Sequence, residues 1–219
     1  MEKKSIHLPR IDGLDNLVAP NEILAILDSR GIRGEINSIN WPEKCPSRPL
    51  ASFVAAYSST GIYVDFLVRC NYLRAENYTD QSPVSEDSCV EFFIDPKGDG
   101  EYWNFEFNCI GTINASRRFE RPNPTRLSTE QLSEIKRYSS CGTRPFREME
   151  GLFTWNLLIF IPFSLIGLDP DNLPKKISGN FYKCASATSE PHYLSWNPIL
   201  TPTPDFHQPQ FFGDIYLDK

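Results

Sequence analysis

Three features are missing from this 219-residue sequence: a cluster of basic residues, a CxxC pair and an apolar segment near the N-terminus. The net charge is −6, and no stripe of lysine and arginine runs along the chain. A surface that binds a nucleic-acid duplex needs clustered cations to displace counterions from the phosphates. We therefore expect no nucleic-acid partner.

The N-terminal segment MEKKSIHLPRIDGLDN has basic residues but no apolar run after them. It is typical neither of a signal peptide nor of a membrane anchor. We expect a protein without membrane contact that stays in the cytoplasm, unless an export signal has been removed from it.

The cysteines are scattered along the chain, and the lack of a CxxC pair argues against a sulfur-bound metal or a redox motif. They are Cys45, Cys70, Cys89, Cys109, Cys141 and Cys184. Four of them fall in strand-like runs, where a thiol behaves as a small core side chain. This favours reduced cysteines in a reducing compartment, with an oxidised, exported protein as the alternative.

The chain has enough apolar residues for one sizeable core, at 40% hydrophobic and 13% aromatic. We expect a single domain over residues 1–219, with residues 1–33 as a preamble packed on it. In this preamble NEILAILDSRG predicts a helix, with Asn21 as N-cap and Gly31 as its stop.

Strand-like runs follow one another from residue 34 to the C-terminus, separated by proline and glycine. They cover 34–41, 51–58, 61–71, 88–95, 101–116, 153–161, 179–186 and 211–217. Only short helical signals interrupt them: a capping box at Ser128 and Gln131 in RLSTEQLSEIKRY, and a short turn of helix in IPFSLIGLDP. The pattern predicts an all-β protein, a two-sheet immunoglobulin-like or jelly-roll-like sandwich with a few short helices.

The run SCVEFFIDPKGDGEYWNFEFN reads as two strands joined by a turn, with acids among apolar residues. Residues two apart in a strand share a face, so Glu106 and Asn108 lie opposite Phe105 and Phe107. Glu91 lies on a mixed face of the other strand. Either these acids are ordinary exposed strand residues, or they form a polar patch suited to sugar hydroxyls, which both donate and accept hydrogen bonds.

The stretch SATSEPHYLSWNPILTPTPDFHQPQ is too irregular for a strand and too apolar for a solvated linker. Long loops with this composition inside a domain are usually functional. Tyr193 and Trp196 are candidates for ligand contact here, since the apolar face of a sugar packs on an indole ring. The alternative is that Trp196 only covers the end of a sandwich. Trp41 and Trp155 lie in apolar strand patterns and are expected in the core.

Three segments, EDSCVEFFIDPKGDGEYWNFEFN, FIPFSLIG and GNFYKC…HYLSWNP…PDFHQPQFFG, together resemble family 9 carbohydrate-binding modules and their DOMON-like relatives. The likeness runs from about residue 35 to the C-terminus. It implies a β-sandwich that binds carbohydrate without catalysis. The members attached to xylanases bind the reducing end of glucan or xylan chains between two tryptophans and carry structural calcium, so the resemblance implies these features as well.

Residue by residue the resemblance is incomplete. Glu91 matches the ligand-contacting glutamate of the family, and Trp196 matches the second stacking tryptophan. Ser85 stands where the first tryptophan would lie, and Glu106 where the modules have an arginine.

We therefore predict binding of an oligosaccharide or polysaccharide, with no catalytic residue, no required cofactor and no metal site. The candidate ligand-binding residues are Glu91, Glu106, Asn108, Arg117, Tyr193 and Trp196. Calcium at the turn carboxylates Asp95 and Asp99 is a further hypothesis.

Two other functions stay open. Glu91 with Glu106 or Asp95 could form the acid/base pair of a glycoside hydrolase. Alternatively, Met149 with His192 or His207 could ligate haem, as some DOMON relatives do.

Overall fold

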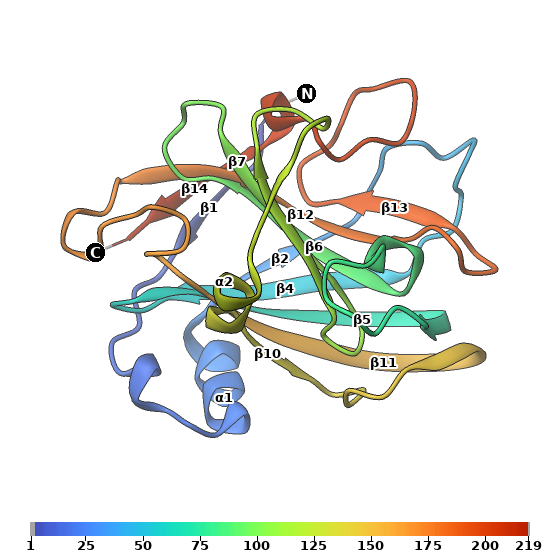
Figure 1. Ribbon diagram of the computed structural model, residues 1–219, viewed down its shortest axis with the longest axis horizontal. Helices are drawn as coiled ribbons and strands as arrows, with labels where there is room; N and C mark the ends of the chain where they lie inside the picture. The colour runs from blue at the N-terminus through green and yellow to red at the C-terminus, as the bar shows by residue number, and fades with distance from the viewer. Residues whose placement is uncertain (1–2, 219) are drawn as a thin grey trace.

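Two sheets lie face to face in the computed structural model, which describes residues 3–218 (Figure 1). The larger, nine-stranded sheet has the order β1-β14-β12-β6-β7-β8-β9, and β13, paired to β12, carries β3. Its strands are β1 (Ser5–Leu8), β3 (Ser38–Ile39), β6 (Cys89–Asp95), β7 (Tyr102–Asn108), β8 (Ile113–Arg118), β9 (Thr125–Arg126), β12 (Lys176–Ala185), β13 (His192–Ser195) and β14 (Gly213–Leu217).

The five-stranded sheet has the order β10-β11-β5-β4-β2, with every neighbouring pair antiparallel. Its strands are β2 (Ile32–Glu35), β4 (Leu50–Tyr57), β5 (Gly61–Ala75), β10 (Lys136–Ser139) and β11 (Phe146–Pro162). The predicted all-β two-sheet sandwich is therefore confirmed. The run predicted as one strand over 101–116 is two strands, β7 and β8, because a turn at 109–112 separates them.

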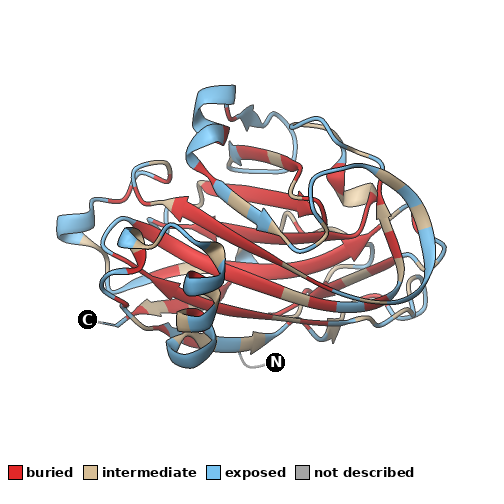
Figure 2. Cartoon of the chain, turned by 90° about the horizontal axis from the view of Figure 1, so that it is seen from below, coloured by how far each residue is buried: buried red, intermediate tan, exposed pale blue. Residues whose placement is uncertain are grey.

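The core fills the space between the sheets, where the strands are almost continuously buried (Figure 2). Phe181 of β12 stacks on Phe53 of β4 and on Phe92 of β6, with ring centroids 3.7 Å and 4.5 Å apart. Trp155 lies in the same cluster, as expected. Trp41 is also buried, but in a second cluster outside the nine-stranded sheet.

Helix α1 (Pro20–Arg30) covers the outer face of the five-stranded sheet, where Ile23 and Leu27 pack against Val54 (Figure 1). It begins one residue before the predicted Asn21 cap, with Ala19 as N-cap and Pro20 in the first turn, a position that proline tolerates. Upstream of it, β1 pairs in parallel with β14, so this part of the predicted preamble is a strand of the larger sheet.

Helix α2 (Thr129–Glu134) has the predicted capping box: the Ser128 hydroxyl accepts from Gln131 N, and the Gln131 side chain accepts from Ser128 N. It stops at Glu134 because the chain then enters β10. The segment at IPFSLIG forms hydrogen-bonded turns rather than the expected helical turn. Short 3-10 helices are η1 (Leu14–Asn16), η2 (Val84–Glu86), η3 (Pro170–Asn172) and η4 (Pro209–Phe211). Among the described residues, no helix is long and apolar enough to cross a membrane.

Trp196 is a core residue, so its predicted role as a sugar-stacking platform is wrong. Its side chain packs edge-on against Phe53 and Phe181, and the residue is 3% exposed. A Cβ added at Gly213 would come within 2.2 Å of the indole ring, so this glycine makes room for it.

Replacing Trp196 with alanine should lower the free energy of unfolding by about 3–5 kcal/mol, because it empties a large volume between the sheets. Chemical denaturation measures the loss. Gly213→Ala should also destabilise the fold, through a clash with the indole. A Trp196→Ala protein as stable as the wild type would contradict the core assignment.

Two aspartates on the helix-covered side of the five-stranded sheet have opposite electrostatic environments. Burial raises the pKa of Asp65 to about 6, although Asn156 donates a hydrogen bond to it. Burial also acts on Asp15, but hydrogen bonds from hydroxyl groups, among them Ser59, Thr60 and Tyr63, outweigh it and lower its pKa.

Asp65→Asn should therefore stabilise the protein at pH 7, by up to about 2 kcal/mol. The unfolded aspartate ionises near pH 4, below the folded one, so the wild type loses stability as pH rises from 4 to 6. The gain of the variant should vanish below pH 4 in urea titrations. Asp15→Asn is the matched control and should destabilise at pH 7. The same sign for both variants would contradict this account.

Candidate functional site

The outer face of the nine-stranded sheet is covered by the segment between β13 and β14, and a second hydrophobic cluster forms beneath it. It contains Trp41, Val84, Cys89, Phe93, Tyr102, Tyr182, Cys184, Ile199, Phe206 and Phe212. Phe206 stacks on Tyr182 with ring centroids 4.2 Å apart, and the Tyr182 hydroxyl donates to the Phe206 carbonyl. Residues 201–208, here called the cover loop, therefore hold a fixed position over β12 and β6.

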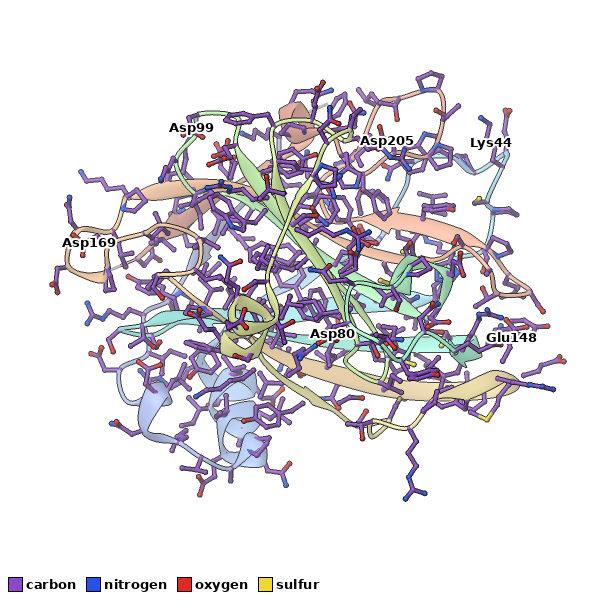
Figure 3. The ribbon with its side chains drawn as sticks, in the orientation of Figure 1. Lys44, Asp80, Asp99, Glu148, Asp169 and Asp205 are labelled. Carbon is purple, nitrogen blue, oxygen red and sulfur yellow. The ribbon has the colours of Figure 1, made fainter. Side chains whose placement is uncertain are left out.

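Asp205 organises the cover loop. Its carboxylate accepts from His207 N at 3.1 Å and from Gln208 Nε2 at 2.7 Å. It also forms an ion pair with Arg121, at 3.4 Å, which ties the loop to the segment after β8. Asp205 lies on the outer side of the nine-stranded sheet, above β6 and β12 (Figure 3).

A pocket of about 240 Å³ opens between the cover loop and the sheet. Its lining combines acids, an arginine, hydroxyls and aromatic rings: Ser85, Glu91, Glu106, Arg121, Cys184, Ser186, Tyr193, Pro204, Asp205, Phe206 and His207. Groups that accept and donate hydrogen bonds thus converge beside apolar rings, which is typical of a site for a small polar ligand.

Glu91 of β6 and Glu106 of β7 are direct cross-strand partners, and the residues are 2% and 7% exposed. Each oxygen of Glu106 accepts from an amide at 2.9 Å, Oε1 from Asn104 and Oε2 from Asn114. Glu91 Oε1 instead contacts the Cys184 thiol, at 3.1 Å. The two acids therefore lie side by side with different partners.

Burial raises the pKa of Glu91 well above its usual range, and the neighbouring Cys184 and Glu106 act in the same direction. Burial also raises the pKa of Glu106, against its amide hydrogen bonds and Arg118, which lower it. Burial therefore favours the neutral form of Glu91. As a neutral acid it can donate as well as accept a hydrogen bond, which suits a hydroxyl ligand.

Residues 23–217 match the model of the protein family described as carbohydrate-binding family 9. The chain belongs to carbohydrate-binding family 9. Carbohydrate binding, the function expected from the sequence, is thus the function of its family. No curated protein matches this family 9 chain.

Solved structures agree with this membership. A protein from Bacteroides uniformis ATCC 8492, assigned to carbohydrate binding, is 32% identical to this family 9 chain, with a TM-score of 0.91 over 99% of this chain and all of that one. A family 9 module from Caldicellulosiruptor kristjanssonii, solved with glucose, has 14% identity, a TM-score of 0.60, and coverage of 98% and 96%. A family 9 module from the same organism, solved with cellotriose, has 15% identity and a TM-score of 0.57, over 98% of this chain and 93% of that one. The last two show the fold alone.

Three of the six predicted site residues, Glu91, Glu106 and Tyr193, line the one pocket. The prediction missed Arg121 and the cover-loop residues beside them. The sequence does point to the cover loop, because the irregular, aromatic-rich segment that contains it was expected to be functional. Its position over the paired glutamates depends on long-range packing that the sequence does not display.

The other three predicted residues lie elsewhere in this family 9 structure. Asn108 is fully buried and uses both of its side-chain atoms: Nδ2 donates to Asp87 and to the Asn77 carbonyl, and Oδ1 accepts from Thr112 N and Ile110 N. Its predicted role in ligand contact is therefore wrong, because it holds a turn together.

Arg117 forms an ion pair with Glu101 at 3.2 Å and lies over the Trp103 ring, outside the pocket lining. Arg117 is the cross-strand partner of Trp103, so its side chain lies on the other face of β8 from Asn114 and Ser116, and its predicted role in ligand contact stays a prediction. Trp196 is the third, for the reason given above.

The carboxylates of the β6–β7 turn bind the backbone. Asp95 accepts from Lys97 N, Gly98 N and Gly100 N, and Asp99 accepts from Glu101 N. These contacts account for both acids as turn residues, and the calcium hypothesis stays a prediction.

The structure places two of the residues named for haem ligation at different sheets. Met149 lies on β11 of the five-stranded sheet, whereas His207 lies over the outer face of the other sheet. Met149 and His207 are therefore not placed to ligate one iron, and the pairing of Met149 with His192 stays a hypothesis.

Four other hollows in the described part of the chain contain none of the six predicted residues. One lies beside β4 and β5 with Arg48, Arg69 and His192, and another, of about 580 Å³, lies between Tyr57 and Tyr216. The pocket under the cover loop is the one where the predicted acids meet.

His207 makes the cover loop sensitive to pH. Its Nδ1 lies 3.1 Å from the Tyr102 hydroxyl. Burial lowers the pKa of His207 to about 3, and Arg118 and Arg121 act in the same direction against Asp205. An unfolded histidine takes up its proton near pH 6.5, so the contribution of His207 to stability is lost as pH falls below that value.

The stability difference between the wild type and His207→Gln should therefore shrink by about 1.4 kcal/mol for each pH unit from 6.5 down to 4.5. Urea titrations of both proteins at matched pH values measure it, and the subtraction removes the contributions of other titrating groups. A difference that does not change with pH would contradict the burial of a neutral His207.

Proposed function

We propose that the pocket under the cover loop binds the terminal sugar of a β-linked gluco- or xylo-oligosaccharide. The observation that carries the proposal is the convergence of Glu91, Glu106 and Tyr193 in one small pocket of a family 9 chain. The related module from Caldicellulosiruptor kristjanssonii solved with glucose and the one solved with cellotriose support this class of ligand.

The groups in the pocket match the chemistry of a sugar. A hydroxyl both donates and accepts, and it would meet the carboxyl groups of Glu91 and Glu106 and the donors of Arg121 and Tyr193. The C–H face of the sugar ring would pack on Phe206 or Tyr193, the rings at the pocket. In this proposal the two rings would take the place of the stacking tryptophans that the family resemblance implies.

The size of the pocket favours one sugar unit over a long chain. Its volume of about 240 Å³ lies below the range of about 300–1,000 Å³ typical of pockets for drug-sized ligands. A polymer would therefore be held by one end. The affinity should be modest, millimolar to micromolar or about −4 to −8 kcal/mol, since hydrogen bonds to sugar hydroxyls replace those to water.

Calorimetric titration with glucose, cellotriose and xylotriose tests the proposal, after a glycan array to widen the choice of ligand. We expect similar affinities for a monosaccharide and its oligomers, because one unit fills the pocket. Product analysis of the same mixtures tests the hydrolase alternative. No binding to any glycan by the folded protein would contradict the proposal.

Two arginines near the end of β8 provide a matched pair of variants. Arg121→Ala removes a donor from the pocket and should weaken binding about 5-fold or more, which corresponds to about 1 kcal/mol. Arg117→Ala removes another exposed, ion-paired arginine, which lies outside the pocket lining, and should change the affinity less than about 2-fold. Equal effects of the two variants would place the sugar elsewhere.

A further inference from the structure

Three side chains that can ligate a metal meet at the floor of the pocket: those of Cys89, Glu91 and Cys184. Cys184 lies more than ninety positions after the other two in the sequence. Cys89 and Glu91 project from the same face of β6, and Cys184 of β12 is the cross-strand partner of Cys89. The two sulfurs and a Glu91 oxygen all lie within 4.8 Å of one another.

The distances suit a small tetrahedral ion. Glu91 Oε1 lies 3.1 Å from Cys184 Sγ and 3.8 Å from Cys89 Sγ. Around a tetrahedral zinc ion, with bonds of about 2.3 Å to sulfur and about 2.0 Å to oxygen, each such pair would be about 3.5 Å apart. Small side-chain adjustments would therefore close the three ligands around one ion.

Glu91 is poorly satisfied without an ion. Among the described residues, the groups that hydrogen-bond to its carboxyl are thiols, which are weak donors, whereas Glu106 beside it receives two amide hydrogen bonds. A buried polar group with weak partners costs free energy. A cation bound by Glu91 and the two sulfurs would compensate this cost.

The site is closed on one side and open on the other. Cys89, Glu91 and Cys184 are all buried, yet Glu91 and Cys184 line the pocket under the cover loop. Three protein ligands with a fourth position open to a pocket is the arrangement of zinc sites that exchange a water for a ligand. Two sulfur ligands disfavour calcium and magnesium, which prefer oxygen.

We propose that Cys89, Glu91 and Cys184 form a binding site for a thiophilic divalent cation such as zinc, with its fourth position facing the pocket. Binding releases to solvent the protons that the thiols and the carboxyl carry. The two thiolates, the carboxylate and a divalent cation together carry one negative charge. This site does not depend on sugar binding, and an ion there would lie where a ligand hydroxyl could reach it.

The test uses the whole chain, fully reduced with a phosphine and freed of metal by a chelator that is then removed. Zinc is titrated against a chromophoric competitor, and cadmium is followed by its thiolate charge-transfer absorption. We expect one ion per chain. Cys184→Ser should weaken binding about 100-fold or more, since it removes a direct ligand. Cys141 is a half-buried thiol between β10 and β11, and Cys141→Ser should leave the metal affinity unchanged.

Cobalt substitution in the wild type needs no variant, so it decides the question even if Cys184→Ser does not fold. A tetrahedral cobalt spectrum with thiolate charge-transfer bands supports the site. Absence of these bands, or binding that Cys184→Ser leaves unchanged, overturns it. Because the probe is the metal alone, the result is independent of whether any sugar binds.

Discussion

The stacking of Phe206 on Tyr182 is the contact on which the site depends. It holds the cover loop against the outer face of the nine-stranded sheet and turns a face that would otherwise meet water into a second hydrophobic cluster. Glu91 and Glu106 are buried because of this cover, and their raised pKa values follow from that burial. Without the cover loop the two acids would be ordinary exposed strand residues, as one of the two sequence interpretations has it.

The roles of the aromatic residues differ from those that the family resemblance implies. Trp196 occupies the core between Phe53 and Phe181, and Ser85 stands at the pocket where a first tryptophan is expected. Tyr193 and Phe206 are the rings left beside the acids. Family membership and fold are retained, and in the site that we propose the sugar meets different side chains from those that the resemblance implies.

Local patterns predicted the parts of the fold that are determined locally. Alternation found β6 and β7, and the Ser128–Gln131 spacing found the cap of α2. The edge strands β1 and β10 were missed because each has only four residues, and β1 also pairs with a segment at the other end of the chain. The segment expected to be too irregular for a strand contains β13, so that prediction was wrong over His192–Ser195, where pairing with β12 fixes the strand.

The same limit applies to the site. Glu91 and Glu106 could be paired from the hairpin alone, since a short turn sets their register. The neighbourhood of Cys89 and Cys184 depends on the pairing of β6 with β12, which no spacing in the sequence displays. Trp196 was misplaced because an indole in a proline-rich segment can face either the core or a ligand, and packing alone decides.

The central claim is that sugar binds on the outer face of the nine-stranded sheet, beneath the cover loop. The most direct test is chemical-shift mapping of the backbone amides while a glycan that binds the protein is titrated in. The account predicts that the shifted amides cluster at Glu106, Arg121, Tyr193 and the cover loop. Shifts centred instead on Arg48, Arg69 and His192, beside β4 and β5, would contradict it.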